Sequence, residues 1–197
     1  MISIYAEKIE EVWFGVATDE QLIFGTSFYF NQQDTLRSLL CSLPFNVPFQ
    51  TISTPTPFAA NILETVRRIY DGKDSSENFS LATEHLSRFN QEVLYATSLV
   101  PVGFVTSYGA LAKAVGGSPR AVGHVMATNP YPPIVPCHRV VSYDFSLGGY
   151  GGGLEVKLEF LAREKRGYKS QREIQINDKA LKIYPVESVF EKIGPKH

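Results

Sequence analysis

The sequence predicts an α+β fold in two parts, a small domain of strands and helices followed by a mostly helical domain with a helix-turn-helix. Short β-branched and aromatic runs near the N-terminus predict the first part, and apolar positions at helical spacing predict the second. A polar stretch over residues 71–84 separates them. We therefore expect a first domain with its linker over residues 1–84, a second over residues 85–168, and a C-terminal extension over residues 169–197.

The composition is that of a folded protein. Of the 197 residues 44% are hydrophobic and 20% charged, which is enough for a sizeable core and argues against disorder. No apolar run reaches the ~18 residues needed to cross a bilayer, so we expect no membrane partner. Cys41 and Cys137 are too few for a disulfide scaffold. This predicts a reducing compartment, the cytoplasm or, in a eukaryote, the nucleus.

The charge is unevenly distributed along the chain. The formal net charge is −1, but residues 1–84 carry −6, residues 85–168 carry +3 and residues 169–197 carry +2. A near-zero total argues against a nucleic-acid partner only where the charge is evenly spread. Here the second part is basic, so the total charge does not exclude a nucleic-acid partner.

The elements of the first part follow in order. Strands are predicted at Ile2–Ala6, Val12–Ala17 and Leu22–Phe28, which are apolar runs separated by polar turns. Two helical patterns come next, and the second places Ile62, Val66 and Ile69 on one face, with Gly72 positioned to cap it.

The second part begins with short helices. One is predicted from about Arg88 to Ser98, and a second runs through Val115 after a cap at Thr106 or Ser107. Its inward stripe consists of Tyr108, Leu111, Ala112 and Val115.

A third helix follows Gly116-Gly117. Ser118 caps it, Pro119 takes its first position, and it continues to about Thr128. Two short helices joined by a glycine-containing turn are typical of a helix-turn-helix.

The two faces of this third helix differ in composition. Its apolar side consists of Val122, Val125 and Met126, and its outer side of Arg120, Gly123, His124 and Ala127. One long cation among small side chains would allow the helix to approach another surface closely. The alternative is an ordinary surface helix weakened by a glycine.

A proline-rich segment precedes Cys137. Four of the twelve prolines lie within residues 130–136, and proline restricts the backbone, so the approach to Cys137 is stiff. A thiolate nucleophile with His138 as its base and positive potential from Arg139 would suit this arrangement. The alternatives are a buried structural cysteine or a zinc ligand. Zinc lacks partners at paired spacing, because only Cys41, His85 and His124 remain.

Five glycines fall within residues 148–153, ahead of a helix predicted from Leu154 to about Arg166. They do not match a dinucleotide fingerprint, and they would let the backbone come close to a ligand or to the helix pair. Leu154, Leu158 and Leu161 predict an inward face that Glu164 continues. A buried carboxylate needs a partner, either His138 or, at a solvent-exposed helix end, Arg163 or Lys165.

These motifs together resemble the O6-alkylguanine-DNA alkyltransferase family. The resemblance rests on Pro136-Cys-His-Arg-Val140, Ser107-Tyr108-Gly, the run from Arg120 to Asn129-Pro, and Gly149-Tyr150 to Gly153-Leu, in matching order over about residues 88–166. It implies a ribonuclease H-like N-terminal domain and a winged helix-turn-helix-like second domain. It also implies a DNA-repair methyltransferase that flips O6-alkylguanine out of duplex DNA and transfers the alkyl group, once per molecule, to its own cysteine.

The resemblance also implies a role for each site residue. Cys137 would accept the alkyl group, His138 would act as base through a water, Glu164 would orient the imidazole, Tyr108 would protonate guanine N3, and Asn129 would brace the turn before the active-site loop. Substrate contacts would come from Val140, Tyr150, Gly151 and Lys157. DNA contacts in the minor groove would come from Arg120 as the finger that fills the gap of the flipped nucleotide, and from Ser107, Gly123, His124 and Ala127.

Gly151 stands where many members of the family carry Ser, so a side-chain contact to the lesion is absent there. The cysteines that bind zinc in some members are missing, and we expect no metal, no cofactor and a monomer. Three other functions are alternatives: an alkylated-DNA binder without transfer activity, which would lack the acceptor cysteine, a thiol hydrolase, and a winged-helix regulator without chemistry.

Overall fold

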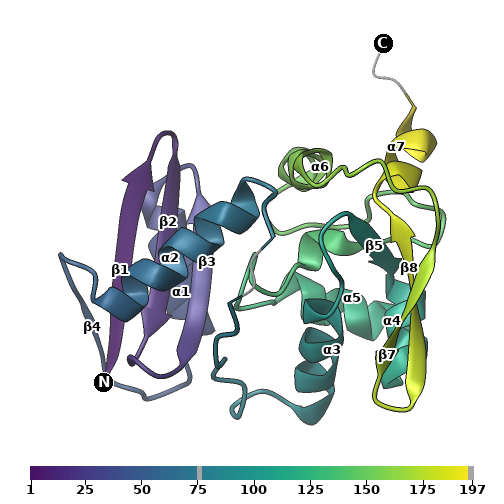
Figure 1. Cartoon of the computed structure of the whole chain (residues 1–197). Helices are drawn as coiled ribbons and strands as arrows, with labels where there is room; N and C mark the ends of the chain where they lie inside the picture. The colour runs from purple at the N-terminus through teal and green to yellow at the C-terminus, as the bar shows by residue number, and fades with distance from the viewer. Residues whose placement is uncertain (75–76, 195–197) are drawn as a thin grey trace. The chain divides into compact units, whose positions relative to one another are not determined.

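The computed structural model describes residues 1–74 and 77–194, which form two compact units (Figure 1). Of the described residues, the first unit comprises 1–70, 74, 77–86 and 130–134, and the second comprises 71–73, 87–129 and 135–194. Residues 130–134 belong to the first unit because they hydrogen-bond within it. The Thr26 amide donates to the Pro130 carbonyl at 3.0 Å, and the Tyr131 hydroxyl donates to the Ala82 carbonyl at 2.6 Å.

The expected ranges 1–84, 85–168 and 169–197 therefore need redrawing. Within the predicted linker, residues 75–76 lie outside the described residues, and residues 80–82 attach to the first unit. Ile23 donates to Ser80 at 2.9 Å and accepts from Ala82 at 2.8 Å. The extension after residue 168 is part of the second unit. Contacts between segments far apart in sequence determine where the linker residues and the extension belong, and local sequence patterns do not encode such contacts.

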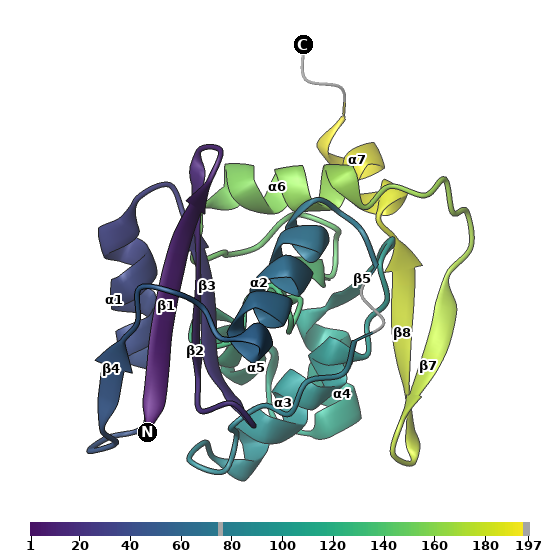
Figure 2. The same cartoon turned by 60° about the vertical axis from the view of Figure 1, so that its left-hand side comes forward.

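The first unit contains a four-stranded sheet in the order β3-β2-β1-β4. Strands β1 (Ile2–Ile9), β2 (Val12–Thr18) and β3 (Ile23–Tyr29) form at the three predicted runs. They are antiparallel, and β4 (Phe49–Thr51) pairs parallel with β1. Two helices, α1 (Gln32–Ser42) and α2 (Pro57–Tyr70), lie on opposite faces of this sheet (Figure 2). Because both faces are covered, β2 is almost entirely buried.

The second unit contains the predicted helix-turn-helix. Helix α3 (Arg88–Ser98) leads to β5 (Phe104–Ser107), and α4 (Tyr108–Val115) and α5 (Pro119–Ala127) follow. Each of the three helices begins at a serine whose hydroxyl accepts from a backbone amide of the first turn, which satisfies one of the free N–H groups there. Ser107 caps α4, so the choice left open between Thr106 and Ser107 is resolved.

A second four-stranded sheet has the order β6-β5-β8-β7. Strand β6 (Val140–Val141) is parallel to β5, and β8 (Lys179–Pro185) is antiparallel to β5 and to β7 (Arg172–Ile176). Helix α7 (Glu187–Ile193) ends the described chain. The extension thus adds two strands and a helix to the second unit.

The extension also supplies part of the core. Val186 and Val189 are fully buried in one cluster with Val105, Val141 and Leu161. We predicted no element for these residues, although Ile174 and Ile176, then Leu181 and Ile183, alternate on either side of Asn177-Asp178, which is a hairpin pattern.

Helix α6 spans Leu154–Arg163, with Glu164 as its C-terminal cap. The predicted inward stripe of leucines is partly wrong, because Leu154 is exposed and the buried side chains of the helix are Lys157, Phe160 and Leu161. Glu164 is fully buried, as its place at the end of the stripe predicts. None of the helices in the described part of the chain is long and apolar enough to cross a membrane.

The buried side of β8 provides a test of the extension. Leu181 is fully buried, so Leu181→Ala should lower the free energy of unfolding by about 2–5 kcal/mol. Lys182→Ala, on the exposed side of the same strand, should change it by less than about 0.5 kcal/mol. Denaturant unfolding of both variants measures the difference. An equally small effect of both would show that the extension does not contribute to the folded core.

Candidate active site

A pocket of about 630 Å³ lies within the second unit. Its walls come from α4, from one face of α5, from Cys137, and from the glycine-rich segment. The lining residues are Tyr108, Pro119, Arg120, Gly123, Met126, Ala127, Cys137, Gly149, Tyr150 and Gly151. The volume is in the range of small-ligand pockets. The outer face predicted for α5 and the candidate nucleophile therefore open into one space.

Cys137 begins the 3₁₀ turn Cys137–Arg139, directly before β6. The Asn129 side chain donates to the Val135 carbonyl at 2.9 Å and also hydrogen-bonds the Cys137 thiol. Asn129 therefore links the end of α5 to the loop that carries the cysteine. Burial raises the pKa of the Cys137 thiol, while the Asn129 hydrogen bond and the charge of Lys157 act in the opposite direction.

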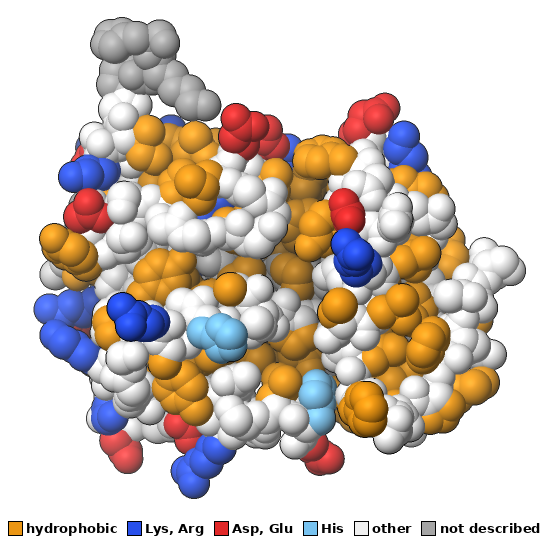
Figure 3. Space-filling view, turned by 180° about the vertical axis from the view of Figure 1, so that it is seen from behind, with side chains coloured by type: hydrophobic (Ala, Val, Ile, Leu, Met, Phe, Trp, Pro, Cys, Tyr) orange, Lys and Arg blue, Asp and Glu red, His pale blue; other side chains and the backbone are white. Residues whose placement is uncertain are grey.

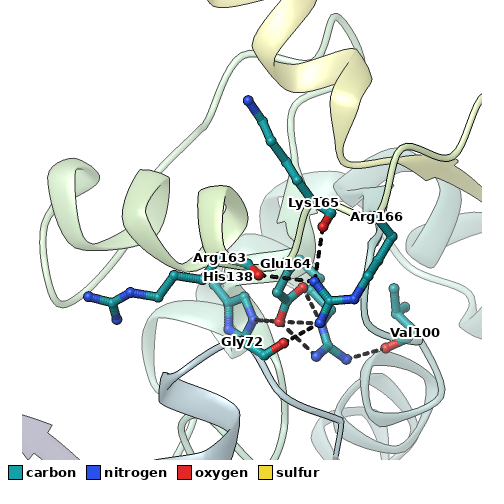
Figure 4. Close-up of polar contacts among 8 residues, drawn as sticks. Gly72, Val100, His138, Arg163, Glu164, Lys165 and Arg166 are labelled. Atoms are coloured by element: carbon teal, nitrogen blue, oxygen red, sulfur yellow. Dashed lines mark hydrogen bonds and ion pairs between the residues drawn. The ribbon is translucent and has the colours of Figure 1, made fainter.

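Glu164 is the centre of a buried hydrogen-bond network (Figure 4). Its Oε1 lies 2.9 Å from His138 Nε2, and Arg139 donates from Nε and Nη2 to its carboxylate at 2.8–3.1 Å. Arg139 Nη1 donates to the Val100 carbonyl at 2.6 Å. Burial alone would raise the pKa of the Glu164 carboxyl, but the interactions with His138 and Arg139 outweigh it and lower the pKa to about 2.

The network gives the two ring nitrogens of His138 different environments. Nε2 lies against the Glu164 carboxylate, which can only accept, so Nε2 carries the hydrogen. Nδ1 is buried and has no hydrogen-bond partner among the described residues. Burial lowers the pKa of His138, and its ring stacks on Phe160 with the ring centres 4.5 Å apart. His138 is thus a neutral imidazole whose Nδ1 lone pair can accept a proton.

Lys157 is fully buried beneath the glycine-rich segment. Its Nζ donates to the carbonyls of Val140 and Leu147 at 2.6 Å and of Gly149 at 3.2 Å. Burial lowers its pKa to about 8, partly opposed by the charge of Cys137. Lys157 does not line the pocket, and the Val140 carbonyl, expected to bind substrate, already accepts from it. The structure therefore places Lys157 as the group that ties the segment 147–149 to β6.

Tyr108 stands at the start of α4, half-buried in the pocket. Its hydroxyl donates to the Gly149 carbonyl at 3.3 Å, and burial and the charge of Cys137 raise its pKa. The phenol therefore keeps its proton at neutral pH. Gly148 has φ +66°, and a Cβ there would lie 2.8 Å from the Tyr108 ring, so both its conformation and its space require glycine.

The outer face of α5 is as predicted: Arg120, His124 and Ala127 are exposed and Gly123 is half-buried, while Val122, Val125 and Met126 are buried. Arg120, Gly123 and Ala127 line the pocket, whereas His124 does not, and Ser107 serves as the α4 cap.

The structure thus brings most of the predicted site residues together. The expectation that Arg139 supplies positive potential to the thiol is wrong, because its charge is neutralised by Glu164. Lys157 is the cation whose charge acts against the rise that burial causes in the Cys137 pKa. No group of three or more His, Cys, Asp or Glu side chains within residues 1–74 and 77–194 is arranged to hold a metal ion.

Comparison with known proteins decides the family. A sequence profile described as the DNA-binding domain of 6-O-methylguanine DNA methyltransferase matches residues 88–166. The methylated-DNA–protein-cysteine methyltransferase of Thermococcus kodakarensis is 34% identical over 170 residues, which cover 83% of this chain and 96% of the relative. The chain belongs to this family.

Other matches are shorter or structural. The methylated-DNA–protein-cysteine methyltransferase of Pyrobaculum aerophilum is 51% identical over 80 residues, and the match spans 41% of this chain and about half, 53%, of that relative. The crystal structure of an O6-methylguanine-DNA methyltransferase from Pyrococcus kodakaraensis matches with a TM-score of 0.63 and 32% identity. The match covers 83% of this chain and 99% of that chain. The α+β fold of two small sheets and their helices is therefore the fold of this family.

The buried network predicts a large effect of Glu164 on stability. Glu164→Gln removes the counter-charge of buried Arg139 and should lower the free energy of unfolding by about 3–5 kcal/mol. Glu159→Gln is the matched control, since its partner Arg163 is at the surface, and should cost less than about 1 kcal/mol. Denaturant unfolding at pH 7 measures both. Equal small effects would contradict the assignment of Glu164 as the structural centre of the site.

The same network predicts how stability depends on pH. The pKa of Glu164 is depressed from its ordinary 4.5 to about 2, so its contribution is complete above about pH 4.5 and is lost as the pH falls toward 2. Thermal melting of the wild type against Glu164→Gln between pH 7 and pH 2 should show a difference that shrinks on acidification. A difference that grows with acid would contradict the sign of this shift.

Proposed function

We propose that this protein repairs duplex DNA by transferring the alkyl group of O6-alkylguanine to Cys137, irreversibly and once per molecule. The observation that carries the proposal is that Cys137 shares a pocket with Tyr108 and with the outer face of α5. A thiol in a pocket lined by the outer face of a helix-turn-helix suits a substrate carried by DNA. One chain supplies all of these groups, so a monomer suffices.

The transfer starts with the thiol proton. His138 Nδ1 accepts it, directly or through a water, and the imidazolium that forms is stabilised by Glu164, 2.9 Å from Nε2. The Asn129 hydrogen bond and the Lys157 charge stabilise the thiolate. The sulfur then forms a bond to the alkyl carbon while the bond from that carbon to O6 breaks.

The electron pair of the broken bond remains on guanine, which must take up a proton. Tyr108 is the donor, because its raised pKa keeps the phenol protonated and it lines the same pocket as Cys137. The products are unmodified guanine and a thioether at Cys137. Since a thioether does not ionise, no nucleophile is regenerated and the reaction stops after one turnover.

The lesion must leave the base stack to reach the sulfur. Extruding a nucleotide costs a few kcal/mol, and Arg120, which lines the pocket and is exposed, would fill the gap that the nucleotide leaves. The small side chains at Gly123 and Ala127 would let α5 enter the minor groove, and Tyr150 and Gly151 would contact the flipped base. These contacts are independent of sequence, as repair of a lesion at any position requires.

We also propose the finer fold relationships. Strand β5 lies between the first two helices of the second unit and pairs with the second strand of the β7–β8 hairpin, which is the order of a winged helix-turn-helix. The antiparallel β1–β2–β3 sheet with helices on both faces supports a ribonuclease H-like first unit.

Intact-mass measurement after mixing with an oligonucleotide duplex that contains O6-methylguanine tests the function. The wild type should gain one methyl group per molecule and then stop. Cys41→Ala, which removes the exposed cysteine, should behave like the wild type, whereas Cys137→Ala should gain none. Binding of the duplex without any mass change, or release of methanol with continued turnover, would refute the proposal.

Arg120 separates the two stages of the reaction. Arg120→Ala should slow transfer from duplex DNA at least about tenfold, or about 1.4 kcal/mol, because only a duplex requires extrusion. Its reaction with free O6-benzylguanine should change little. Arg37→Ala, at an exposed position of α1, controls for the lost charge. Equal slowing with duplex and free base would argue against a role in base extrusion.

A further inference from the structure

The β7–β8 hairpin lies beyond the part of the chain that the family profile covers, which ends at residue 166. It is nevertheless built onto the helix-turn-helix. Val105 of β5 pairs with Tyr184 of β8, and the Thr106 hydroxyl donates to the Lys182 carbonyl at 2.8 Å, one residue before the Ser107 cap of α4.

The hairpin continues past β5. Strand β8 pairs with β5 through Tyr184 and Pro185, so residues 179–183 and their partners on β7 extend beyond the paired part by about 15 Å, alongside α4. The projection ends in the two-residue turn Asn177-Asp178, where Asn177 has φ 52°. Its buried side, with Leu181 and Ile183, anchors it to the unit, and its other side is exposed.

The helix-turn-helix itself carries few cations. Residues 104–129 contain only Lys113 and Arg120, whereas sequence-independent DNA affinity depends on cations that contact phosphates. Strand β8, which packs against α4, carries two exposed lysines, Lys179 and Lys182. In Figure 3, Lys and Arg side chains gather along the left-hand edge, over the hairpin.

Lys179 and Lys182 are the exposed cations of β8: Lys179 follows the turn, and Lys182 lies across from Glu173 of β7. Arg172 is held over the rings of Phe104 and Tyr168, at 4.8 and 5.3 Å from their centres. Within the described residues neither Lys179 nor Lys182 forms an ion pair, and both are exposed on β8, which packs against α4.

We propose that the β7–β8 hairpin is a DNA-binding wing, in which Lys179 and Lys182 contact backbone phosphates of the duplex beside the helix-turn-helix. The proposal rests on the proposed function, because it needs duplex DNA at α5. It gives the C-terminal extension a role in affinity for DNA, and none in the transfer step at Cys137.

The test compares two double variants that remove the same charge. Lys179→Gln/Lys182→Gln removes it from the hairpin, and Arg37→Gln/Arg67→Gln removes it from exposed positions of α1 and α2 in the first unit. Affinity for an undamaged duplex is measured over a series of salt concentrations. The hairpin variant should bind at least about fivefold more weakly at low salt, and its slope of log K against log salt should fall by about 1.8, or 0.9 for each lost phosphate contact. The control should match the wild type.

Reaction with free O6-benzylguanine and the melting temperature show that the hairpin variant is folded. The DNA-binding role of the hairpin would be overturned if the hairpin variant had the affinity and salt slope of the wild type, or if the control variant lost as much affinity as the hairpin variant. Failure of the wild type to take a methyl group from a methylated duplex would instead overturn the proposed function, so the two failures are distinguishable.

Discussion

The buried carboxylate of Glu164 is the constraint on which the second unit depends. Glu164 is the C-terminal cap of α6, and its carboxylate accepts hydrogen bonds from Arg139 Nε and Nη2 and lies against His138 Nε2. Arg139 in turn donates to the carbonyl of Val100, just after α3. Removing two charges from water is costly, and the pair recovers that cost only with all of its hydrogen bonds in place. The network therefore fixes α3, α6 and the turn at Cys137–Arg139 relative to one another.

The same pairing divides the electrostatic roles around the thiol. Arg139 is next but one to Cys137 in sequence, yet its charge is neutralised by Glu164. Within residues 1–74 and 77–194 Lys157 has no carboxylate partner and donates to three carbonyls, so its charge acts on Cys137. The base and the cation of the site thus come from different elements: His138 from the turn, held by the end of α6, and Lys157 from the middle of that helix.

Local signals in the sequence predicted much of this site. Serine caps and the Pro119 position located α4 and α5, and helical spacing placed Tyr108 inside and Arg120 outside. The need to pair a carboxylate on an inward face left His138 and the helix-end pair Arg163 or Lys165 as alternatives, and the structure decides for His138. That face was assigned to leucines, however, and Leu154 is exposed. Lys157 is buried instead, because the carbonyls of Val140, Leu147 and Gly149 accept hydrogen bonds from the lysine ammonium. Tertiary structure determines such partners. It also determines that residues 130–134 belong to the first unit and that the extension belongs to the second.

The protonation state of His138 tests the account most directly. Nitrogen-15 NMR of the imidazole side chains, with the His138 signals identified from a His138→Asn variant, reports which ring nitrogen carries the hydrogen. The account predicts a neutral ring at pH 7 with hydrogen on Nε2 and none on Nδ1, and no titration near the ordinary pKa of about 6.5. A protonated ring at pH 7, or hydrogen on Nδ1, would contradict it, since His138 could not then accept the thiol proton.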